Sequence, residues 1–363
     1  MDHDVASTPA AAGFAMPAEF SPHAGCLMAW PSRDELWAGR LDAAKHDFAA
    51  VASAIAAFEP VVMVCNPGHA QEVRSHCGAG VTPVEIPIND SWSRDSGPAF
   101  VTHASNEVAV VGFGFNAWGN RWHPHDDDAR LSARLAEWLG LRYFSAPFVL
   151  EGGSFYVDGE GTVFTTEQCL LNPNRNPDLT RSQIENGLCE HLGASTVIWL
   201  PFGHSLDTGP AGTDGHVDGV LQIVAPGHVL LEAVSDPASP EHERGIANLE
   251  RLRASRDAAG RTLQVSILDP GPDAAVSYVN STSRTVPSSC RPAATTPTRP
   301  PCRRCARRTP TATSWACRAR RSRSVAAART ASPNRSPPGS RSPSDTAIRR
   351  PGWRSRSLGT VLP

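Results

Sequence analysis

Three short segments of this 363-residue sequence carry the side chains most able to do chemistry: residues 92–98 (WSRDSGP), 150–154 (LEGGS) and 214–218 (DGHVD). They supply three carboxylates and one imidazole as candidate reactive groups: Asp95, Glu151, Asp218 and His216. If residues 216–218 lie on a strand, His216 and Asp218 project from the same face and can address one ligand. That pairing of an imidazole with a carboxylate suits catalysis or metal binding.

Each segment taken alone also has a structural explanation. Asp95 follows Arg94 and could form a structural ion pair with it. Glu151 precedes two glycines and could lie in a turn. His216 could be a hydrogen-bonded core histidine. Singly, each segment is therefore weak evidence for a functional site.

The spacing of apolar residues predicts a helix followed by a strand at four places along the chain. The expected helices cover residues 41–58, 130–140, 184–192 and 246–252. The strands expected after them cover residues 61–65, 143–150, 196–200 and 263–268. Two further apolar runs, 217–224 and 228–234, flank Ala225-Pro226-Gly227 and predict a β-hairpin. This recurrence indicates an α/β fold.

Two stretches that contain candidate residues, 89–95 and 151–153, directly follow expected strands, residues 84–88 and 148–150. A strand fixes the position of a side chain at its end, and glycine lets a ligand approach the backbone closely. We therefore expect the site to collect at strand ends.

The formal net charge of −2 conceals two regions of opposite charge. Residues 1–280 contain 16 basic and 35 acidic residues, whereas residues 281–363 contain 18 arginines and a single acid, Asp345. The second region is rich in Pro, Ser, Thr and Ala and has only two aromatic residues. Such a composition cannot build a hydrophobic core, so we expect residues 281–363 to be disordered.

The first residues (MDHDVASTPAAAGFA) have acids where a signal peptide needs basic side chains, and no apolar run reaches membrane-spanning length. We therefore expect a cytoplasmic protein that does not enter a membrane.

Five cysteines lie in or beside apolar segments, as reduced thiols do, so no disulfide is expected. They are Cys26, Cys65, Cys77, Cys169 and Cys189. Cys302 and Cys305 form a C-x-x-C pair, but the other cysteines near them have the wrong spacing for zinc.

Taken together and in order, the segments resemble the agmatine deiminase family, a branch of the guanidino-group-modifying enzymes that includes bacterial-type peptidylarginine deiminases. The resemblance rests on seven motifs: MPAEFSPH at 16–23, MAWP at 28–31, NDSWSRDSGPAF at 89–100, FGFNAWG at 113–119, EGG at 151–153, TTEQCLLN at 165–172 and GHVD at 215–218. It covers residues 16–280, which we expect to be an incomplete catalytic domain after a flexible N-terminus of residues 1–15.

The resemblance implies an α/β propeller of five ββαβ units around a central channel, with the last unit missing or disordered here. It also implies attack of a cysteine thiolate on a guanidinium carbon, loss of ammonia and hydrolysis of a covalent thiouronium intermediate, with no cofactor or metal. Asp95 and Asp218 match positions that bind the guanidinium, whose charge paired carboxylates can neutralise. Glu151 and His216 match acid/base positions. Trp92 matches an aromatic that lies against the substrate.

The family's nucleophile lies near the C-terminus in a G-G-G-G-x-H-C-I-T-Q-Q signature, which occurs nowhere in this sequence. A shift of the reading frame by one base explains its loss. Residues 281–292, reverse-translated and read one base earlier, can give FYLANGAVVVP, and the same shift over residues 326–336 can give GGGPHCITQQI. The cysteine codon would straddle Thr330 and Ala331. We therefore interpret residues 281–363 as frameshifted and predict that the chain is catalytically defective.

The leading hypothesis is an agmatine deiminase by descent, which converts agmatine and water to N-carbamoylputrescine and ammonia. The alternatives within the family are a peptidylarginine or other guanidine deiminase and a non-catalytic guanidine-binding pseudoenzyme. From other classes, we consider a metal-dependent hydrolase with His216, Asp218 and His23 or His204 as ligands, and a basic tail that binds nucleic acid non-specifically. The sequence leaves the oligomeric state open and is compatible with a homo-oligomer.

Overall fold

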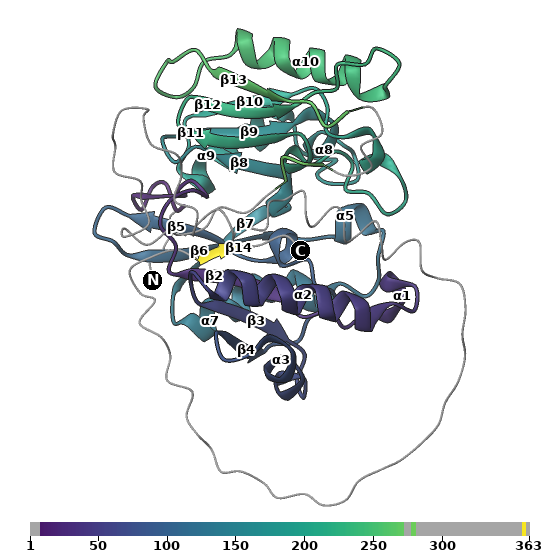
Figure 1. Ribbon diagram of the computed structural model, residues 1–363. Helices are drawn as coiled ribbons and strands as arrows, with labels where there is room; N and C mark the ends of the chain where they lie inside the picture. The colour runs from purple at the N-terminus through teal and green to yellow at the C-terminus, as the bar shows by residue number, and fades with distance from the viewer. Residues whose placement is uncertain (1–7, 272–276, 281–357, 361–363) are drawn as a thin grey trace, which may run out of the picture. The chain divides into compact units, whose positions relative to one another are not determined.

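The computed structural model describes residues 8–271, 277–280 and 358–360 (Figure 1). These residues form four sheets with helices packed against them. Residues 281–357 and 361–363 lie outside the described residues, so their expected disorder and the frameshift stay predictions. Residues 358–360 of the same region form a strand, so the expectation of disorder needs correction there.

Three of the sheets share one connectivity, ββαβ. In each, the first two strands are antiparallel, and the third follows a helix and lies parallel to the second. The first unit comprises β5 (Ala99–His103), β6 (Val108–Gly114), α7 (Leu131–Leu139) and β7 (Arg142–Val149). The second comprises β8 (Phe155–Val157), β9 (Thr162–Thr166), α9 (Arg181–Leu192) and β10 (Thr196–Leu200). The third comprises β11 (Leu221–Ala225), β12 (His228–Glu232), α10 (Pro240–Ala254) and β13 (Gln264–Leu268).

The fourth sheet is parallel throughout, in the order β14-β2-β3-β4. Its strands are β2 (Gly25–Ala29), β3 (Val61–Cys65), β4 (Val81–Glu85) and, at one edge, β14 (Leu358–Thr360). Parallel neighbours need crossover connections, which α2 (Leu41–Ala56) and α3 (Ala70–Cys77) provide. Every residue of β2 and β3 is buried, as is usual for parallel strands covered on both faces.

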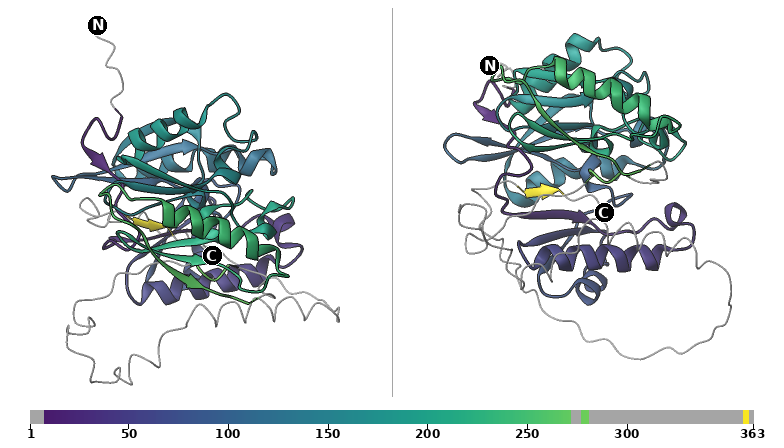
Figure 2. Two further views of the ribbon diagram at one scale, coloured as in Figure 1. Left: turned by 90° about the horizontal axis from the view of Figure 1, so that it is seen from above. Right: turned by 45° about the horizontal axis from the view of Figure 1, so that its top comes forward.

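Local sequence signals set the ends of the long helices. Thr180 and Gln183 form a capping box at the start of α9, and Gly193 ends it in the left-handed conformation. Ser239 caps α10, whose first residue is Pro240. α10 packs against β10, β12 and β13 (Figures 1 and 2). The helices are thereby fixed on the sheets, and the loops at the strand ends are available to carry the residues of a site.

Short helical turns occupy several of these loops. They are α1 (Asp34–Trp37), α4 (Ser93–Ser96), α5 (Ala117–Asn120), α6 (Asp126–Ala129), α8 (Glu167–Leu170) and the 3-10 turns η1 (Gly152–Ser154), η2 (Ser205–Thr208) and η3 (Val217–Gly219). Two contacts link three of them, α4 with η1 and η1 with η3. Each of these three turns contains or adjoins a candidate reactive residue.

The α/β class and the predicted helix-then-strand steps are confirmed. The strands at residues 61–65 and 196–200 have the predicted bounds. The hairpin also exists, but its first strand begins at Leu221, because residues 217–219 form η3. The prediction that His216 and Asp218 share one face of a strand is therefore wrong. The carboxylate of Asp207 accepts the backbone N–H groups of Gly215 and His216, and so occupies donors that a neighbouring strand would need.

The N-terminal segment is more ordered than expected, because residues 8–15 are part of the described structure. β1 (Phe14–Ala15) pairs with β5 in antiparallel register. The backbone N–H of Met16 donates to the carbonyl of Leu192. The expectation of a flexible stretch up to residue 15 therefore needs correction for residues 8–15.

No helix within the described residues combines the length and apolar character needed to cross a membrane. The five cysteines in this part of the chain are free thiols, and all but Cys189 are buried.

Candidate active site

The structure brings the four candidate reactive groups together. Asp95 lies in α4, Glu151 follows β7, His216 precedes η3, and Asp218 lies within η3. The Nδ1 atom of His216 is 3.8 Å from Oδ1 of Asp95, and its Nε2 atom is 3.9 Å from Oε2 of Glu151. All four residues are buried, with Glu151 fully so. Three loops that are distant in sequence thus converge on one small volume.

Gly153 lies at the centre of this cluster. A Cβ atom at position 153 would stand 2.5 Å from Nδ1 of His216, 2.7 Å from Oδ2 of Asp218 and 2.9 Å from Oδ1 of Asp95. These separations are shorter than any tolerable contact, so a side chain here would displace the reactive groups. Glycine is required at position 153 because the reactive groups approach its backbone closely.

Asp95 is held by hydrogen bonds to each carboxylate oxygen. The backbone N–H of Gly153 donates to Oδ1 at 2.8 Å, and the indole N–H of Trp118 donates to Oδ2 at 2.9 Å. Arg94 instead pairs with Glu19 at 3.1 Å and donates to the carbonyl of Gly152. The alternative that Asp95 serves as the ion-pair partner of Arg94 is therefore wrong.

The turn that carries Trp118 has an unusual backbone. Four successive residues, 117–120, adopt positive φ angles, and Trp118 itself has φ 56° and ψ 45°. This left-handed conformation costs about 1–3 kcal/mol for a bulky side chain and persists where surrounding contacts enforce it. Here the Trp118 indole forms the hydrogen bond to Asp95 and packs on Phe115. The strained turn thus positions a donor for a candidate reactive carboxylate.

A buried arginine that the sequence did not single out holds Glu151. The Nε atom of Arg175 donates to Oε1 of Glu151 at 2.6 Å, and neither side chain is exposed. Arg175 also bonds to Asp214 at 2.7 Å and to the carbonyl of Thr213. Asp214 in turn pairs with Arg121. One oxygen of Glu151 is thereby fixed, and the other faces His216.

The surroundings shift the pKa values of these groups in different directions. Burial alone would raise the pKa of Glu151, but His216 and Arg175 lower it below its ordinary value. Burial would lower the pKa of His216, yet Asp95, Cys169 and Glu151 together raise it well above the usual value. Burial raises the pKa of Asp218 to about 7, although His216 and Arg94 oppose the shift. The cluster therefore favours a charged imidazole beside a charged glutamate.

Trp92 lies at the edge of the site among other aromatic residues. It is partly buried, stacks on Trp37 with ring centroids 6.1 Å apart, and packs against the cluster of Phe115 and Trp118. Its ring contributes to the wall that supports Trp118. A contact with substrate stays a prediction.

The ligand set of the metal-hydrolase alternative is not brought together. His23 hydrogen-bonds to Glu59 and to the carbonyl of Glu19, and His204 lies beside Glu232 and Glu241. Within the described residues, the groups close enough to share a metal ion are two other sets: His23 with Cys26 and Glu59, and Glu151 with Cys169 and His216.

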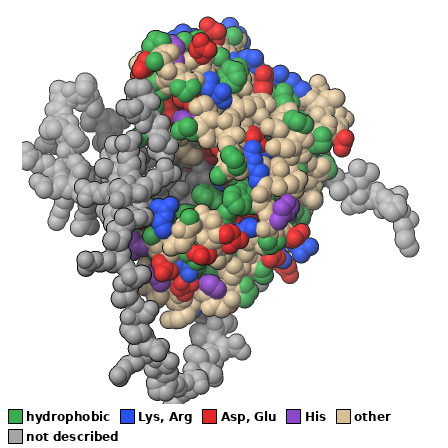
Figure 3. Space-filling view, turned by 90° about the vertical axis from the view of Figure 1, so that its right-hand side faces the viewer, with side chains coloured by type: hydrophobic (Ala, Val, Ile, Leu, Met, Phe, Trp, Pro, Cys, Tyr) green, Lys and Arg blue, Asp and Glu red, His purple; other side chains and the backbone are tan. Residues whose placement is uncertain are grey.

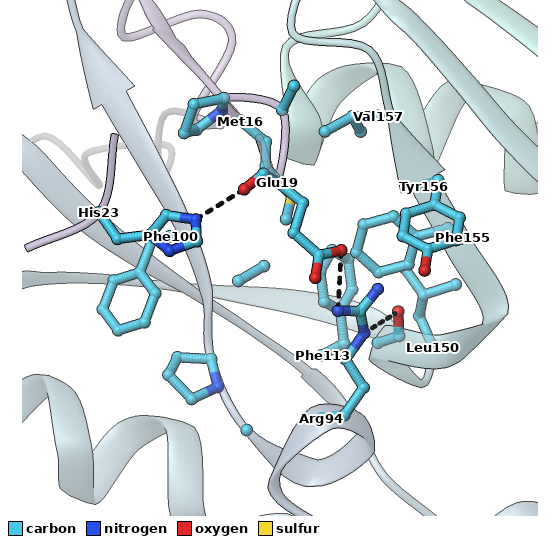
Figure 4. Close-up of a pocket in the computed structure, with 16 residues that line it drawn as sticks. Met16, Glu19, His23, Arg94, Phe100, Phe113, Leu150, Phe155, Tyr156 and Val157 are labelled. Carbon is cyan, nitrogen blue, oxygen red and sulfur yellow. Dashed lines mark hydrogen bonds and ion pairs between the residues drawn. The ribbon is translucent and has the colours of Figure 1, made fainter. Parts of the chain in front are cut away.

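A mostly apolar pocket of about 80 Å³ adjoins the loops that carry Asp95 and Gly153. Arg94 and Gly152, the neighbours of Asp95 and Gly153, contribute to its lining. Figure 4 shows Arg94 reaching toward Glu19, with the ring of Tyr156 nearby. The Arg94 guanidinium lies 5.1 Å from the centre of that ring. A partly buried ion pair among apolar side chains therefore lies next to the loops that carry Asp95 and Gly153.

Fold and site together define an α/β protein whose strand-end loops gather buried carboxylates and an imidazole around one glycine. Residues 15–285 match the Porphyromonas-type peptidyl-arginine deiminase family, and the chain therefore belongs to that family.

Relatives with assigned names support the same placement. The chain is 44% identical over 273 residues to the agmatine deiminase of Pseudomonas aeruginosa, covering 73% of each protein. It is 44% identical over 275 residues to the agmatine deiminase of Pseudomonas fluorescens, again over 73% of each. It is also similar to the solved agmatine deiminase of Enterococcus faecalis, with a TM-score of 0.69 and 39% identity over 73% of each chain. The predicted resemblance is confirmed.

Proposed function

We propose that the chain is an agmatine deiminase by descent, whose site is shaped to hydrolyse agmatine to N-carbamoylputrescine and ammonia. The observation that carries the proposal is the convergence of Asp95, Glu151, His216 and Asp218 around Gly153. The relatives named agmatine deiminase supply the substrate. Peptidylarginine and free arginine are the alternatives that a substrate panel would separate.

In this proposal Asp95 and Asp218 hold the flat guanidinium. A guanidinium is permanently charged and offers donors in a planar fork, which two carboxylates can accept. The substrate cation would also favour the ionised form of Asp218, whose pKa is raised to about 7 by burial. Binding and ionisation of this carboxylate are therefore linked.

Glu151 and His216 would handle protons. A thiolate attacks the guanidinium carbon, the C–N bond to the leaving nitrogen breaks, and that nitrogen needs a proton to depart as ammonia. The protonated imidazole of His216 is suited to supply it. Water then attacks the thiouronium carbon, loses a proton to the imidazole and releases the thiol. The Glu151 carboxylate, 3.9 Å from Nε2, stabilises the protonated imidazole between these steps.

The nucleophile is proposed to belong to the segment lost by frameshift. The family match ends at residue 285, close to the predicted shift after Asn280. Cys169 lies near His216, but it is fully buried, packs within an apolar core cluster, and has a pKa raised by that burial. A buried, protonated thiol is a poor nucleophile. We therefore propose that the chain as it stands is catalytically defective.

The missing nucleophile accompanies a proposed missing unit of the fold. The three ββαβ units and the parallel sheet would be four parts of a five-unit propeller, whose fifth unit the frameshift replaces. The relatives support this reading, because the match covers 73% of their length as well as of this chain.

Ammonia release from agmatine tests the proposal. The chain as it stands should release none above background, whereas the frame-restored protein should be active. Replacing the restored cysteine by serine should abolish that activity. The Cys169→Ser variant of the frame-restored protein should still carry out the chemical step. Activity of the unaltered chain that disappears in Cys169→Ser would overturn the assignment of the nucleophile. Agmatine binding without turnover by the unaltered chain would support the pseudoenzyme form of the proposal.

We propose that the protein is cytoplasmic. Nucleic acid is not proposed as a specific partner, and any non-specific binding would fall to the arginine-rich region, of which only residues 358–360 are described. On the face shown in Figure 3, acidic and basic side chains of the described residues are interspersed, so that face offers no extended basic surface.

A further inference from the structure

One side of the reactive cluster contains a set of groups that the proposed reaction does not use together. Glu151, Cys169 and His216 each offer one ligand atom (a carboxylate oxygen, Sγ and a ring nitrogen), and these three atoms all lie within 4.8 Å of one another. Oε2 of Glu151 and Nε2 of His216 are buried and have no hydrogen-bond partner within the described residues. At 3.9 Å, their separation is too long for a direct hydrogen bond. Two unpartnered polar atoms in a buried site are costly unless something lies between them.

The chemistry and spacing of these three atoms fit a borderline-soft divalent cation. Zinc binds thiolate, imidazole and carboxylate at about 2.0–2.3 Å, which places neighbouring ligand atoms about 3.3–3.8 Å apart in a tetrahedron. The 3.9 Å between Oε2 and Nε2 exceeds the roughly 3.4 Å expected for a nitrogen and an oxygen on one zinc ion. These two atoms would therefore move about 0.5 Å closer on binding, and the thiol would approach them.

The groups behind the ligand atoms are also arranged as a metal site needs. Oε1 of Glu151 is held by Arg175 at 2.6 Å, so Oε2 is the oxygen left to coordinate. Nδ1 of His216 lies 3.8 Å from Oδ1 of Asp95, beyond hydrogen-bond distance, so this carboxylate acts on the imidazole through its charge. Such outer partners orient ligands and strengthen metal binding.

We propose that Glu151, Cys169 and His216 form a binding site for one thiophilic divalent cation, such as Zn²⁺, with a fourth position left for water. This inference goes beyond the proposed deimination and does not depend on it. An ion there would occupy the imidazole and the glutamate that the reaction needs, so the two uses of the site exclude each other.

A second His–Cys–Glu set in the described structure is the natural comparison. Cys26 donates its thiol hydrogen to Glu59, and His23 contacts both Glu59 and the carbonyl of Glu19. Those groups already satisfy one another, whereas Oε2 of Glu151 and Nε2 of His216 do not. We therefore expect the ion to prefer the set that contains Cys169.

Cobalt and zinc titrations of the full chain test the proposal. The base protein carries serine at Cys290, Cys302, Cys305 and Cys317, which removes competing thiols. Co²⁺ should produce a thiolate charge-transfer band with one equivalent bound, and Zn²⁺ should displace it. Because the thiol of Cys169 and the charged imidazole of His216 must both lose a proton to bind the ion, affinity should rise with pH.

Variants locate the ion. Cys169→Ser should abolish the charge-transfer band, and Glu151→Gln and His216→Gln should each weaken Zn²⁺ binding at least about tenfold. The matched control Cys26→Ser should bind as tightly as the base protein. Circular dichroism confirms that each variant is folded. The proposal is overturned if the base protein gives no band, or if Cys26→Ser loses the band while Cys169→Ser keeps it. Neither result depends on ammonia release, so it leaves the proposed function untouched.

Discussion

Glu151 and Asp218 belong to the same buried cluster but differ in how their charge is balanced. Glu151 has a buried arginine bonded to one oxygen, and its pKa is lowered. Asp218 forms no ion pair with a lysine or arginine of the described residues, and burial raises its pKa to about 7. Glu151 is thus ionised in the folded protein and is paired with Arg175. Asp218 has no such partner, so a bound cation would favour its ionised form, which is the behaviour expected of a substrate ligand.

The largest effect is expected from removing the cation of Glu151. Arg175→Met leaves a buried carboxylate without its partner, and should lower the free energy of unfolding by about 3–5 kcal/mol. Urea denaturation measures this loss. Arg181→Met is the matched control, because Arg181 is 42% exposed and pairs with Glu167 and Glu185 at the surface, so its loss should cost under about 1 kcal/mol. Equal losses in both variants would contradict a special role for Arg175.

A second effect concerns the point where Asp95, His216 and Asp218 meet. Gly153→Ala should lower kcat/KM of the frame-restored protein at least about 100-fold, because its Cβ displaces the reactive groups. Gly209→Ala provides the control, since a Cβ there would meet no atom within 4 Å. Unchanged kinetics in Gly153→Ala would mean that these three groups do not act together.

A smaller effect is expected from pH through Asp218. With a pKa of about 7, its ionised fraction rises about tenfold from pH 6 to pH 8, so agmatine should bind about tenfold more tightly at pH 8. Calorimetry at the two pH values measures this. The Asp218→Asn variant should bind agmatine weakly at both pH values.

The raised pKa of Asp218 also affects the stability of the protein. The folded state holds the Asp218 proton more tightly than the unfolded state does, so the contribution of Asp218 to the free energy of unfolding falls as pH rises toward 7.

The smallest effect concerns Asp95, the carboxylate held by two neutral donors. Trp118→Phe removes the indole N–H and keeps most of the ring, so the loss should be about one hydrogen bond. We expect a three- to tenfold decrease in agmatine affinity, measured by calorimetry. A larger loss, comparable to that of Gly153→Ala, would show that the strained turn controls the whole site.

The sequence was sufficient for the class of fold and for a set of four candidate residues that lie together in the structure. Apolar runs such as residues 61–65 become buried strands because nothing competes with their burial. The order of the motifs pointed to Asp95, Glu151, His216 and Asp218, which the structure brings together.

What the sequence could not give was the environment of these groups. Arg175 lies in a loop with no periodic pattern, and its bond to Glu151 joins residues 24 positions apart. The conformation of residues 215–218 depends on Asp207, whose carboxylate accepts from their backbone. Neither interaction leaves a local signal, because both depend on loops that meet only after the sheets have packed.

The N-terminal segment has a practical consequence for anyone who produces this protein. Its Glu19 is the partner of Arg94, and Arg94 supports the loop that carries Asp95. Extra residues added ahead of residue 8 would leave this pair in place. Removing the first twenty residues to obtain a shorter expression product would instead delete Glu19. The Arg94 guanidinium would then lie beside Tyr156 without its carboxylate partner, and the loop that carries Asp95 would lose this support.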